Sequence, residues 1–496
     1  LTGAGGSLRT NARPASASTP RNWKAAVGNS RLWNRFLAFC ASLVRGGQRS
    51  RLPPVPGCGT LVPEQELSAR ESCRRVEGHQ RLYAQEESPM RLVEQHVITR
   101  TDPHYRSIDA AAFASKNLWN AANYLVRQAF LKEGIYLNNT AVYHLIKGHA
   151  AYQALPRKVS NQVLLQLHQA WESFFEAMQV WREHPEQFTG RPKLPKYKHK
   201  TAGRNLLVYE RGAIWKRELN RGLIALSGLG ALGQTKQSRK TVDQVRLVPK
   251  ADHYVLEVVY QREVTPAPVA PELFVAADLG VNVLSALVSN KPGFVPRLGN
   301  GHPLKATNQL YNKQRAHLQQ QLAKANRFTS RQLDRLTTKR NRRVLQYLHT
   351  ASRRIIKLLV EEGIGTLVIG KNPLWKQGVE LGHKHNQEFV QILHARFIDL
   401  LTYKAELVGI RVILTEESYT SQASFLDRDP LSTYDPAREE HPHFSGRRDG
   451  RWYRASGNRL LHSDVNGAYN IGRKVVPTAF GPGIGAAAVR PRRLAV

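Results

Sequence analysis

A short apolar run that ends in an aspartate is the feature that most constrains the fold of this chain. The run Leu273–Ala277 is entirely apolar, and Asp278 follows it directly. Such a run predicts a buried strand, and open α/β sheets place their ligand sites at the carboxyl ends of their strands. Far downstream, residues 461–471 predict a loop that enters a helix, with Asp464 near its start. We therefore expect an α/β domain in which Asp278 and Asp464 are candidate site residues.

The charge of the chain indicates what it binds. Its 496 residues include 73 Lys and Arg but 38 Asp and Glu, a formal net charge of +35. A field this positive requires an anionic partner, and nucleic acid is the usual one. The hydrophobic content of 41% excludes a disordered polycation. No apolar run approaches the roughly 18 residues of a membrane span, and no basic amphipathic helix indicates a membrane surface, so we expect no membrane partner.

Two carboxylates placed together would repel each other unless a cation bridges them. Hard oxygen ligands select Mg²⁺ or Mn²⁺. Two such ions about 4 Å apart could activate water and stabilise the leaving oxygen of a phosphodiester. Either aspartate alone is weak evidence, because an aspartate at the end of a strand also occurs in structural turns.

Residues 1–89 differ from the rest of the chain. They are rich in Gly, Ser, Pro and Arg and lack sustained hydrophobic periodicity. We interpret them as a disordered extension or as upstream sequence from an over-extended reading frame, with Met90 as the true start; a small accessory domain is the alternative. All three cysteines lie here, at Cys40, Cys58 and Cys73. The rest of the chain therefore has no disulfide framework and no thiolate zinc site, which favours a reducing compartment, the cytoplasm.

From Met90 on, the sequence predicts a small β domain that is interrupted by helices. Residues 91–99 predict a strand, and apolar residues around Pro249–Asp252 predict a hairpin. One helix is expected around 118–129, and a second over 163–181 with Ser160 as its N-cap. The tryptophans of the second helix could stack on bases, but their place on its apolar stripe favours helix packing.

Two basic segments are candidate nucleic-acid contacts. The link 190–200 is punctuated by prolines, so its cations would be held apart along an extended segment that suits a phosphate backbone; a solvated linker is the alternative. Its candidates are Arg191, Lys193, Lys196, Lys198 and Lys200, with Tyr197 as a base-stacking residue. The second segment lies in a long helical insertion, 304–362, whose basic face is a nucleic-acid contact or an ordinary solvated face. Its candidates are Lys339, Arg340, Arg342 and Arg343.

Four motifs, in this order, resemble those of the TnpB (OrfB) proteins of bacterial insertion sequences, which are relatives of the type V CRISPR effectors and the Fanzor proteins. They are Ala277-Asp278-Leu279-Gly280, Tyr403-Lys404-Ala405-Glu406, Tyr419-Thr420-Ser421-Gln422 and Asp464-Val465-Asn466-Gly467-Ala468-Tyr469-Asn470-Ile471. The resemblance covers roughly residues 90–480.

The resemblance implies a fold and a function. It implies a RuvC-type, RNase H-like nuclease domain over 271–480, after a β-barrel wedge domain over 90–102 and 190–270. A helical recognition insert over 103–189 would interrupt the wedge domain, and 481–496 would be a flexible tail. The resemblance further implies a cytoplasmic, nucleoid-associated enzyme encoded by a transposable element. Such an enzyme cleaves double-stranded DNA beside a short adjacent motif, guided by an RNA from the element's own transcript.

The sequence departs from this family where a zinc ribbon is expected. Paired cysteines usually follow the Tyr-Thr-Ser-Gln motif, but here Ser424 and Asp427 stand near the first pair, and the insert 423–460 contains no cysteine. Its His441-Pro442-His443 segment lacks the spacing of metal ligands. We therefore predict no zinc.

The middle acid of the family is also missing. It normally ends the strand Thr366–Gly370, where this chain continues Gly370-Lys371-Asn372. Either the nuclease is inactive, or the acid has moved to Glu417, beyond the next predicted strand, as in some TnpB and Fanzor proteins. Strands lie about 4.8 Å apart, glycine leaves the missing side chain's volume open, and glutamate can reach across it.

We therefore predict an active site of Asp278, Glu417 and Asp464, which hold Mg²⁺ or Mn²⁺. Glu416 is the fallback, because neighbouring residues on a strand point to opposite faces. The leading hypothesis is a metal-dependent, RNA-guided DNA endonuclease. The alternatives are a nuclease-inactive regulator that binds DNA or RNA, and a transposase that itself joins strands.

Overall fold

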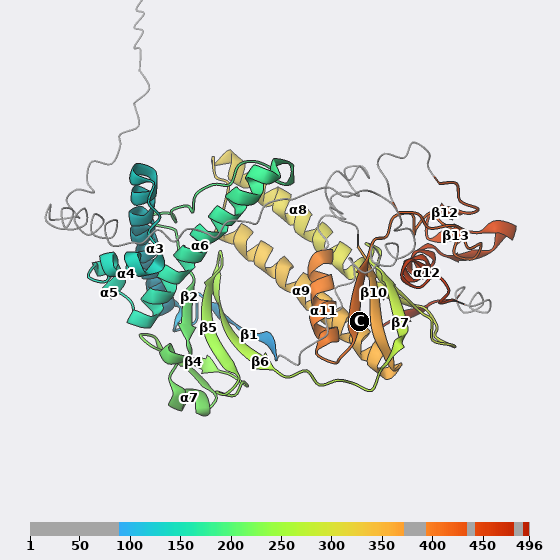
Figure 1. Ribbon diagram of the computed structural model, residues 1–496, viewed down its shortest axis with the longest axis horizontal. Helices are drawn as coiled ribbons and strands as arrows, with labels where there is room; N and C mark the ends of the chain where they lie inside the picture. Colours follow the sequence, from blue (N-terminus) through green and yellow to red (C-terminus); the bar gives the residue numbers. More distant parts are fainter. Residues whose placement is uncertain (1–88, 372–392, 434–441, 481–489, 496) are drawn as a thin grey trace, which may run out of the picture. The chain divides into compact units, whose positions relative to one another are not determined.

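The computed structural model describes residues 89–371, 393–433, 442–480 and 490–495 (Figure 1). All of them belong to one compact unit, Ala84–Val496. The predictions for residues 1–88, for His441 and for residues 481–489 concern positions outside the described residues.

A four-stranded antiparallel sheet, in the order β1-β6-β5-β2, forms the first part of the described chain. Its strands are β1 (Met90–Thr99), β2 (Leu207–Glu210), β5 (Val242–Pro249) and β6 (His253–Arg262). β5 and β6 are the predicted hairpin, with Pro249 paired to Tyr254. A separate ribbon, β3 (Leu223–Leu226) and β4 (Gly230–Gln234), follows the short helix α7 (Lys216–Asn220). No pairing among the described strands closes the sheet, so the β-barrel stays a prediction.

Four α-helices lie between β1 and β2 in the sequence. They are α3 (Tyr105–Glu133), α4 (Asn139–Ile146), α5 (Ala150–Gln153) and α6 (Arg157–Glu183). α3 ends at Gly134, whose φ of 68° is the left-handed conformation that glycine adopts without a Cβ clash. Trp171 of α6 is fully buried and donates to Asn123 Oδ1 at 3.1 Å, so this tryptophan packs helices.

The predicted N-cap of the second helix was wrong. α6 begins at Arg157, with Pro156 at the N-cap position. Ser160 lies inside the helix, buried, and its hydroxyl donates to the carbonyl of Tyr152 at 2.7 Å. The helix starts earlier than predicted, directly after Pro156, so the serine lies in its first turn and bonds the segment before it.

The second sheet has six strands in the order β11-β10-β7-β8-β9-β15. β7, β8 and β9 are antiparallel neighbours, whereas β10 and β11 continue parallel to β7. The bounds are β7 (Ala270–Asp278), β8 (Val283–Ser289), β9 (Arg297–Asn300), β10 (Ile364–Gly370), β11 (Arg411–Thr415) and β15 (Arg492–Leu494). The chain is therefore a mixed α/β protein, and β7 is the buried strand that the apolar run predicts.

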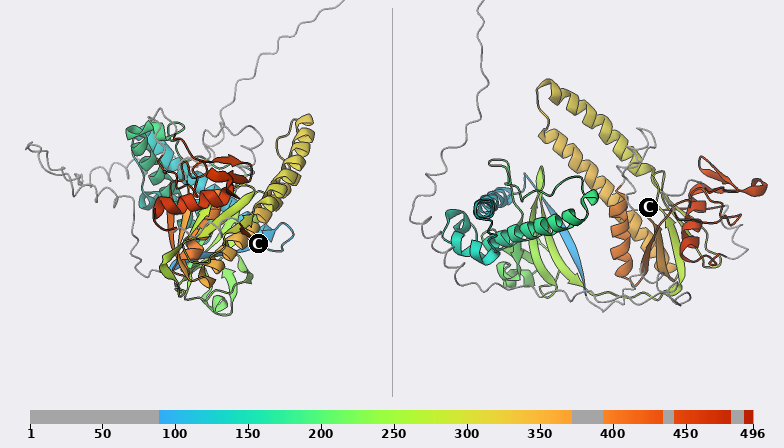
Figure 2. Two further views of the ribbon diagram at one scale, coloured as in Figure 1. Left: turned by 90° about the vertical axis from the view of Figure 1, so that its right-hand side faces the viewer. Right: turned by 45° about the horizontal axis from the view of Figure 1, so that its top comes forward.

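Helices cover both faces of this sheet (Figure 1). α9 (Arg331–Glu361) and α11 (His394–Glu406) pack on one face, and α12 (Ser463–Val475) packs on the other. α8 (His302–Lys324) forms an antiparallel pair with α9 (Figure 2). A small sheet of β12 (Arg447–Asp449), β13 (Trp452–Arg454) and β14 (Leu460–His462) precedes α12. No helix in the described ranges has the length and apolar character needed to cross a membrane.

Within the tail that the sequence predicted as flexible, 481–496, the described residues 492–494 are ordered. Residues 492–494 form β15, which pairs in parallel with β9. The amide of Arg492 donates to the carbonyl of Pro296 at 2.8 Å, and Leu494 packs against the core between the sheet and α9. Edge pairing and one apolar contact thus order a segment whose composition alone favours a loop.

Candidate active site

Asp278 is the last residue of β7, in the sheet layer that α12 covers. It pairs with Ala286 of β8. A Cβ added to Gly467 of α12 would lie 2.5 Å from Asp278 Oδ2. Glycine at 467 therefore lets the backbone of α12 approach the carboxylate, which gives a physical reason for the glycine in the Asp464–Ile471 motif.

Glu417 follows β11, the strand next to β10. Gly370, the last residue of β10, pairs with Thr415 of β11. A Cβ added to Gly370 would lie 2.5 Å from Glu417 Oε2 and 3.2 Å from Glu417 Cβ. The carboxylate of Glu417 thus occupies the volume that a side chain at position 370 would fill.

Glu416 faces a different partner. Its carboxylate accepts from Lys474 Nζ near the end of α12 and from the backbone amide of Ser418. These bonds hold the pKa of Glu416 below its ordinary value although its partial burial works to raise it. The carboxylate of Glu416 is thus bonded to a lysine, whereas that of Glu417 lies beside Gly370.

Asp464 lies in the first turn of α12. The imidazole of His462 accepts from the amide of Asp464 at 3.3 Å and caps the helix. Arg448 of β12 contacts the carboxylate, with Nη2 3.1 Å from Oδ1. Sequence reasoning missed Arg448, because a single arginine in an insert carries no local signal of the residue that it contacts.

The charges of Asp464 and Glu417 act on the pKa of Asp278. Burial, then the charges of Asp464 and Glu417, raise the pKa of Asp278 well above its ordinary value, and Arg448 partly opposes this. Burial, then the charge of Glu416, raises the pKa of Glu417 to about 7, against the effect of Lys474. Three carboxylates thus share one region, and oxygen donors of this kind suit a hard cation.

The side chains as they stand do not form a closed metal-ligand set. Within the described ranges, no group of three or more His, Cys, Asp or Glu side chains is arranged to hold a metal ion. Asp464 is turned to Arg448. Their oxygen donors fit Mg²⁺ or Mn²⁺, but the side chains would have to rearrange to meet around one ion.

The loop that carries Glu417 is fastened to the helix that carries Asp464. Thr420 donates its amide and hydroxyl to the carbonyl of Glu417, at 3.2 and 2.8 Å. Asn470 of α12 donates to the carbonyl of Thr420 at 3.0 Å, and Asn466 donates to that of Ala423 at 2.7 Å. Two of the sequence motifs therefore meet at this contact, which fixes the two acids relative to each other.

Two hydrogen-bonded carboxylates link the two ends of the insert in the region where the family usually carries a zinc ribbon. Asp427 accepts from Ser424 Oγ at 2.6 Å and from the amide of Ser456 at 3.0 Å, and it also pairs with Arg459. Asp429 accepts from the amides of Ser424, at 2.7 Å, and Ser445, at 3.1 Å. These bonds join the start of the insert to the β12–β14 region without cysteine; the absence of zinc stays a prediction.

The basic link 190–200 is not a free extended segment, because its backbone is bound by α3. Side chains of α3 bind its backbone: Trp119 donates to the carbonyl of Lys196 at 3.2 Å, and Asn120 bonds both the carbonyl and the amide of Lys198 at 2.8 Å. Lys198 is partly buried, with Nζ 4.6 Å from the Trp119 ring centroid, which makes it a poor phosphate contact. The other candidates stay at least partly exposed: Arg191, Lys193, Lys196, Tyr197 and Lys200.

One of the four candidates on α9 joins helices together. Arg340 donates to Asn308 of α8 at 2.8 Å and lies over the ring of Tyr311. Its guanidinium therefore contributes to the contact between α8 and α9. The other three keep exposed surface on α9: Lys339, Arg342 and Arg343.

Comparison with known proteins gives two family matches. A family described as a probable transposase (OrfB_IS605) matches residues 257–375, and a Cas12f1-like TNB domain matches residues 394–471. The second match ends within α12. The two matched ranges contain Asp278, Glu417 and Asp464. A comparison with the curated proteins found no match.

Solved structures similar to this chain are nucleic-acid complexes and nucleases by their titles. A Cas12f1–sgRNA–target DNA complex has a TM-score of 0.41 at 13% sequence identity. The alignment covers 74% of this chain and 83% of the protein chain in that complex, and the two coverages are given in the same order below. The mini-RNA-guided endonuclease CRISPR-Cas_phi3 has a TM-score of 0.40 at 9% identity, covering 85% and 95%. CasPhi-2 bound to crRNA has a TM-score of 0.36 at 10% identity, covering 79% and 99%.

Proposed function

We propose, from the premise that this chain is TnpB-like as its two family matches show, that it is an RNA-guided, metal-dependent DNA endonuclease encoded by a transposable element. The domain that carries the chemistry would be RuvC-like, of the RNase H class. The observation that carries the proposal is the position of the Glu417 carboxylate in the volume beside Gly370. There it restores an acid next to the strand that ends in Asp278.

Each acid has a defined role in this proposal. Asp278, Glu417 and Asp464 would hold Mg²⁺ or Mn²⁺, and ions bound there would supply an activated water and stabilise charge on the phosphodiester. A side chain at position 370 or 467 would collide with one of these carboxylates, and glycine at both positions avoids this. α12 packs on the face of the sheet that carries Asp278.

Arg448 would contact the substrate. Its side chain is 47% exposed while its Nη2 contacts Asp464, so it lies at the edge of the site. A guanidinium binds phosphate oxygens in a bidentate geometry. We propose that Arg448 binds the non-bridging oxygens of the phosphate at which the DNA strand is cut.

A nuclease-inactive protein that binds nucleic acid is the second candidate. The observation that favours it is that the described acids form no closed ligand set as they stand. In that case Arg448 would be a permanent ion-pair partner of Asp464.

The test uses the full chain purified from cells that transcribe the flanking region of its gene. Its co-purified RNA is sequenced, and a plasmid that matches this RNA is incubated with the complex in Mg²⁺. The proposal expects cleavage that is lost after ribonuclease treatment and lost with an unmatched plasmid. Cleavage that persists without RNA would contradict guidance, and binding without any cleavage would favour the second candidate.

A further inference from the structure

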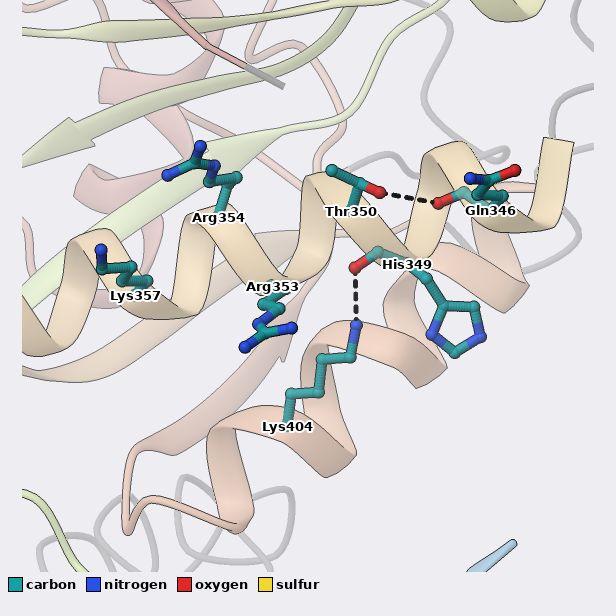
Figure 3. A pocket seen from close by; sticks show the side chains of 7 residues that line it. All are labelled: Gln346, His349, Thr350, Arg353, Arg354, Lys357 and Lys404. Carbon is teal, nitrogen blue, oxygen red and sulfur yellow. Dashed lines mark hydrogen bonds between the residues drawn. The ribbon is translucent and has the colours of Figure 1, made fainter. Parts of the chain in front are cut away.

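A cavity of about 660 Å³ lies between α9 and α11, in the layer that covers the sheet opposite α12 (Figure 3). We call it the α9–α11 pocket. It is lined by Gln346, His349, Thr350, Arg353, Arg354, Lys357 and Lys404. Four of these side chains are cations, and none is an acid. This set does not overlap the predicted nucleic-acid contacts.

Little negative charge balances these cations. α9 carries nine Lys and Arg and two acids, Asp334 and Glu361. Lys357 pairs with Glu361 at 3.3 Å, but both side chains are more than half exposed, so the pair is weak. In the part of the chain that the structure describes, Arg353 and Arg354 have no ion-pair partner. Cations held together without acids indicate a site for an anion.

The floor of the pocket is fixed in place. Lys404 reaches from α11 to α9, and its Nζ donates to the carbonyl of His349 at 2.8 Å (Figure 3). The same Nζ also donates to Ser352 Oγ at 2.6 Å. An ammonium group has three donors, so one remains for a ligand. The helix itself is anchored by Ile355 and Leu359, which are fully buried against the sheet. The cations are therefore presented by a rigid surface.

The pocket continues a stripe of polar and basic residues along α9. Positions 339, 343, 346, 350, 353 and 357 follow one another at intervals of three or four residues and so lie on one helix face. At 1.5 Å per residue, the stripe from Lys339 to Lys357 is about 27 Å long. Its length and cationic character fit a chain of phosphates better than a single small anion.

We propose that the α9–α11 pocket binds phosphates of a nucleic-acid backbone, as the continuation of the basic stripe that begins at Lys339. Arg353 and Lys357 contact successive phosphates, and the spare N–H of Lys404 completes the site at the floor. The proposal rests on the nucleic-acid binding of the proposed function and not on cleavage. Backbone phosphates are common to RNA, DNA and their hybrids, and the experiment separates these sources.

The test measures binding of the full chain, in EDTA, to three short labelled probes: a DNA duplex, an RNA–DNA hybrid and a single-stranded RNA. The double variant Arg353→Gln/Lys357→Gln is compared with the matched control Lys216→Gln/Arg217→Gln, two exposed cations of α7 with the same loss of charge. Both pairs lie on the surface, so unchanged thermal melting is expected for both.

The salt dependence of binding gives the result. Each lost phosphate contact reduces the slope of log K against log salt by about 0.9 for duplex DNA. Two contacts reduce it by about 1.8, which is roughly a 30-fold loss of affinity near 0.15 M salt relative to about 1 M. The pocket variant should show this loss with at least one probe, and that probe identifies the source of the phosphates. Equal behaviour of the pocket and control variants, or an unchanged slope with all three probes, would overturn this proposal. Because the probes are only bound and not cut, such a result would leave the proposed cleavage activity untested by this experiment and still open to its own test.

Discussion

The substitution Gly370→Ala tests whether Glu417 has taken the place of the missing acid. The new Cβ would lie 2.5 Å from Glu417 Oε2, 2.7 Å from Ile471 Cδ1 and 3.2 Å from Glu417 Cβ. An ordinary van der Waals contact is about 3.5–4.0 Å, so the carboxylate would have to move by about 1 Å. Overpacking of this kind costs about 1–3 kcal/mol, and a displacement of about 1 Å in an active site can cost about 10²-fold in rate.

The assay compares plasmid cleavage, DNA binding and thermal melting of the variant. We expect cleavage to fall about 10²-fold while DNA binding is retained. The matched control is Gly233→Ala in β4, where an added Cβ meets no atom within 4 Å. It controls for the loss of a strand glycine and should leave cleavage unchanged.

A reciprocal pair of variants sharpens this test. Glu417→Ala empties the volume beside Gly370, and Gly370→Asp then returns an acid to the end of β10. The double variant should cleave faster than Glu417→Ala alone, because it returns a carboxylate to the volume that Glu417 leaves, once the end of the Ile471 side chain has shifted. Wild-type cleavage by Gly370→Ala, or a double variant no better than the single, would show that Glu417 does not replace the missing acid.

The contacts around the site give three further predictions. Asp427→Ala leaves Ser424, Ser456 and Arg459 without their acceptor, so chemical denaturation should show a loss of about 1–3 kcal/mol in the free energy of unfolding. Hydrogen bonds from Ser424 and Ser456 hold the pKa of Asp427 below its ordinary value, although burial opposes them. The stability that this carboxylate contributes should therefore be complete at neutral pH and be lost as the pH falls below about 4; a pH series of melts should show a smaller acid loss for Asp427→Asn than for the parent chain. Arg448→Ala should lower the cleavage rate about 10²-fold, as removal of a charge-stabilising donor does, with little change in DNA affinity, whereas a matched loss of affinity would mean that Arg448 only binds DNA.

Local patterns in the sequence were sufficient to predict the elements that end in the site. The apolar run before Asp278 predicts β7 because a buried strand needs no other context, and the hairpin around Pro249–Asp252 is likewise local. Both appear in the structure as predicted. The parallel pairing of β10 with β11 is not local, yet it alone places Thr415 beside Gly370 and thus brings Glu417 to the vacant volume.

Side-chain partners distant in sequence could not be predicted. Arg340 belongs to a basic run, but Asn308 and Tyr311, which hold it, lie on another helix. The link 190–200 reads as a free extended segment, because nothing in its own residues shows that Trp119 and Asn120 bind its backbone. The α9–α11 pocket was missed for the same reason, since Lys404 comes from a different helix than its other cations.

The most direct test of the proposed active site is a comparison of two neighbouring glutamates. Glu417→Gln and Glu416→Gln remove the same charge from adjacent positions, but one side chain fills the volume beside Gly370 and the other is bonded to Lys474. Magnesium-dependent cleavage of a plasmid that matches the co-purified RNA is measured for both. We predict that Glu417→Gln abolishes cleavage and retains DNA binding, while Glu416→Gln still cleaves. Full activity of Glu417→Gln would contradict the assignment of Glu417 to the active site.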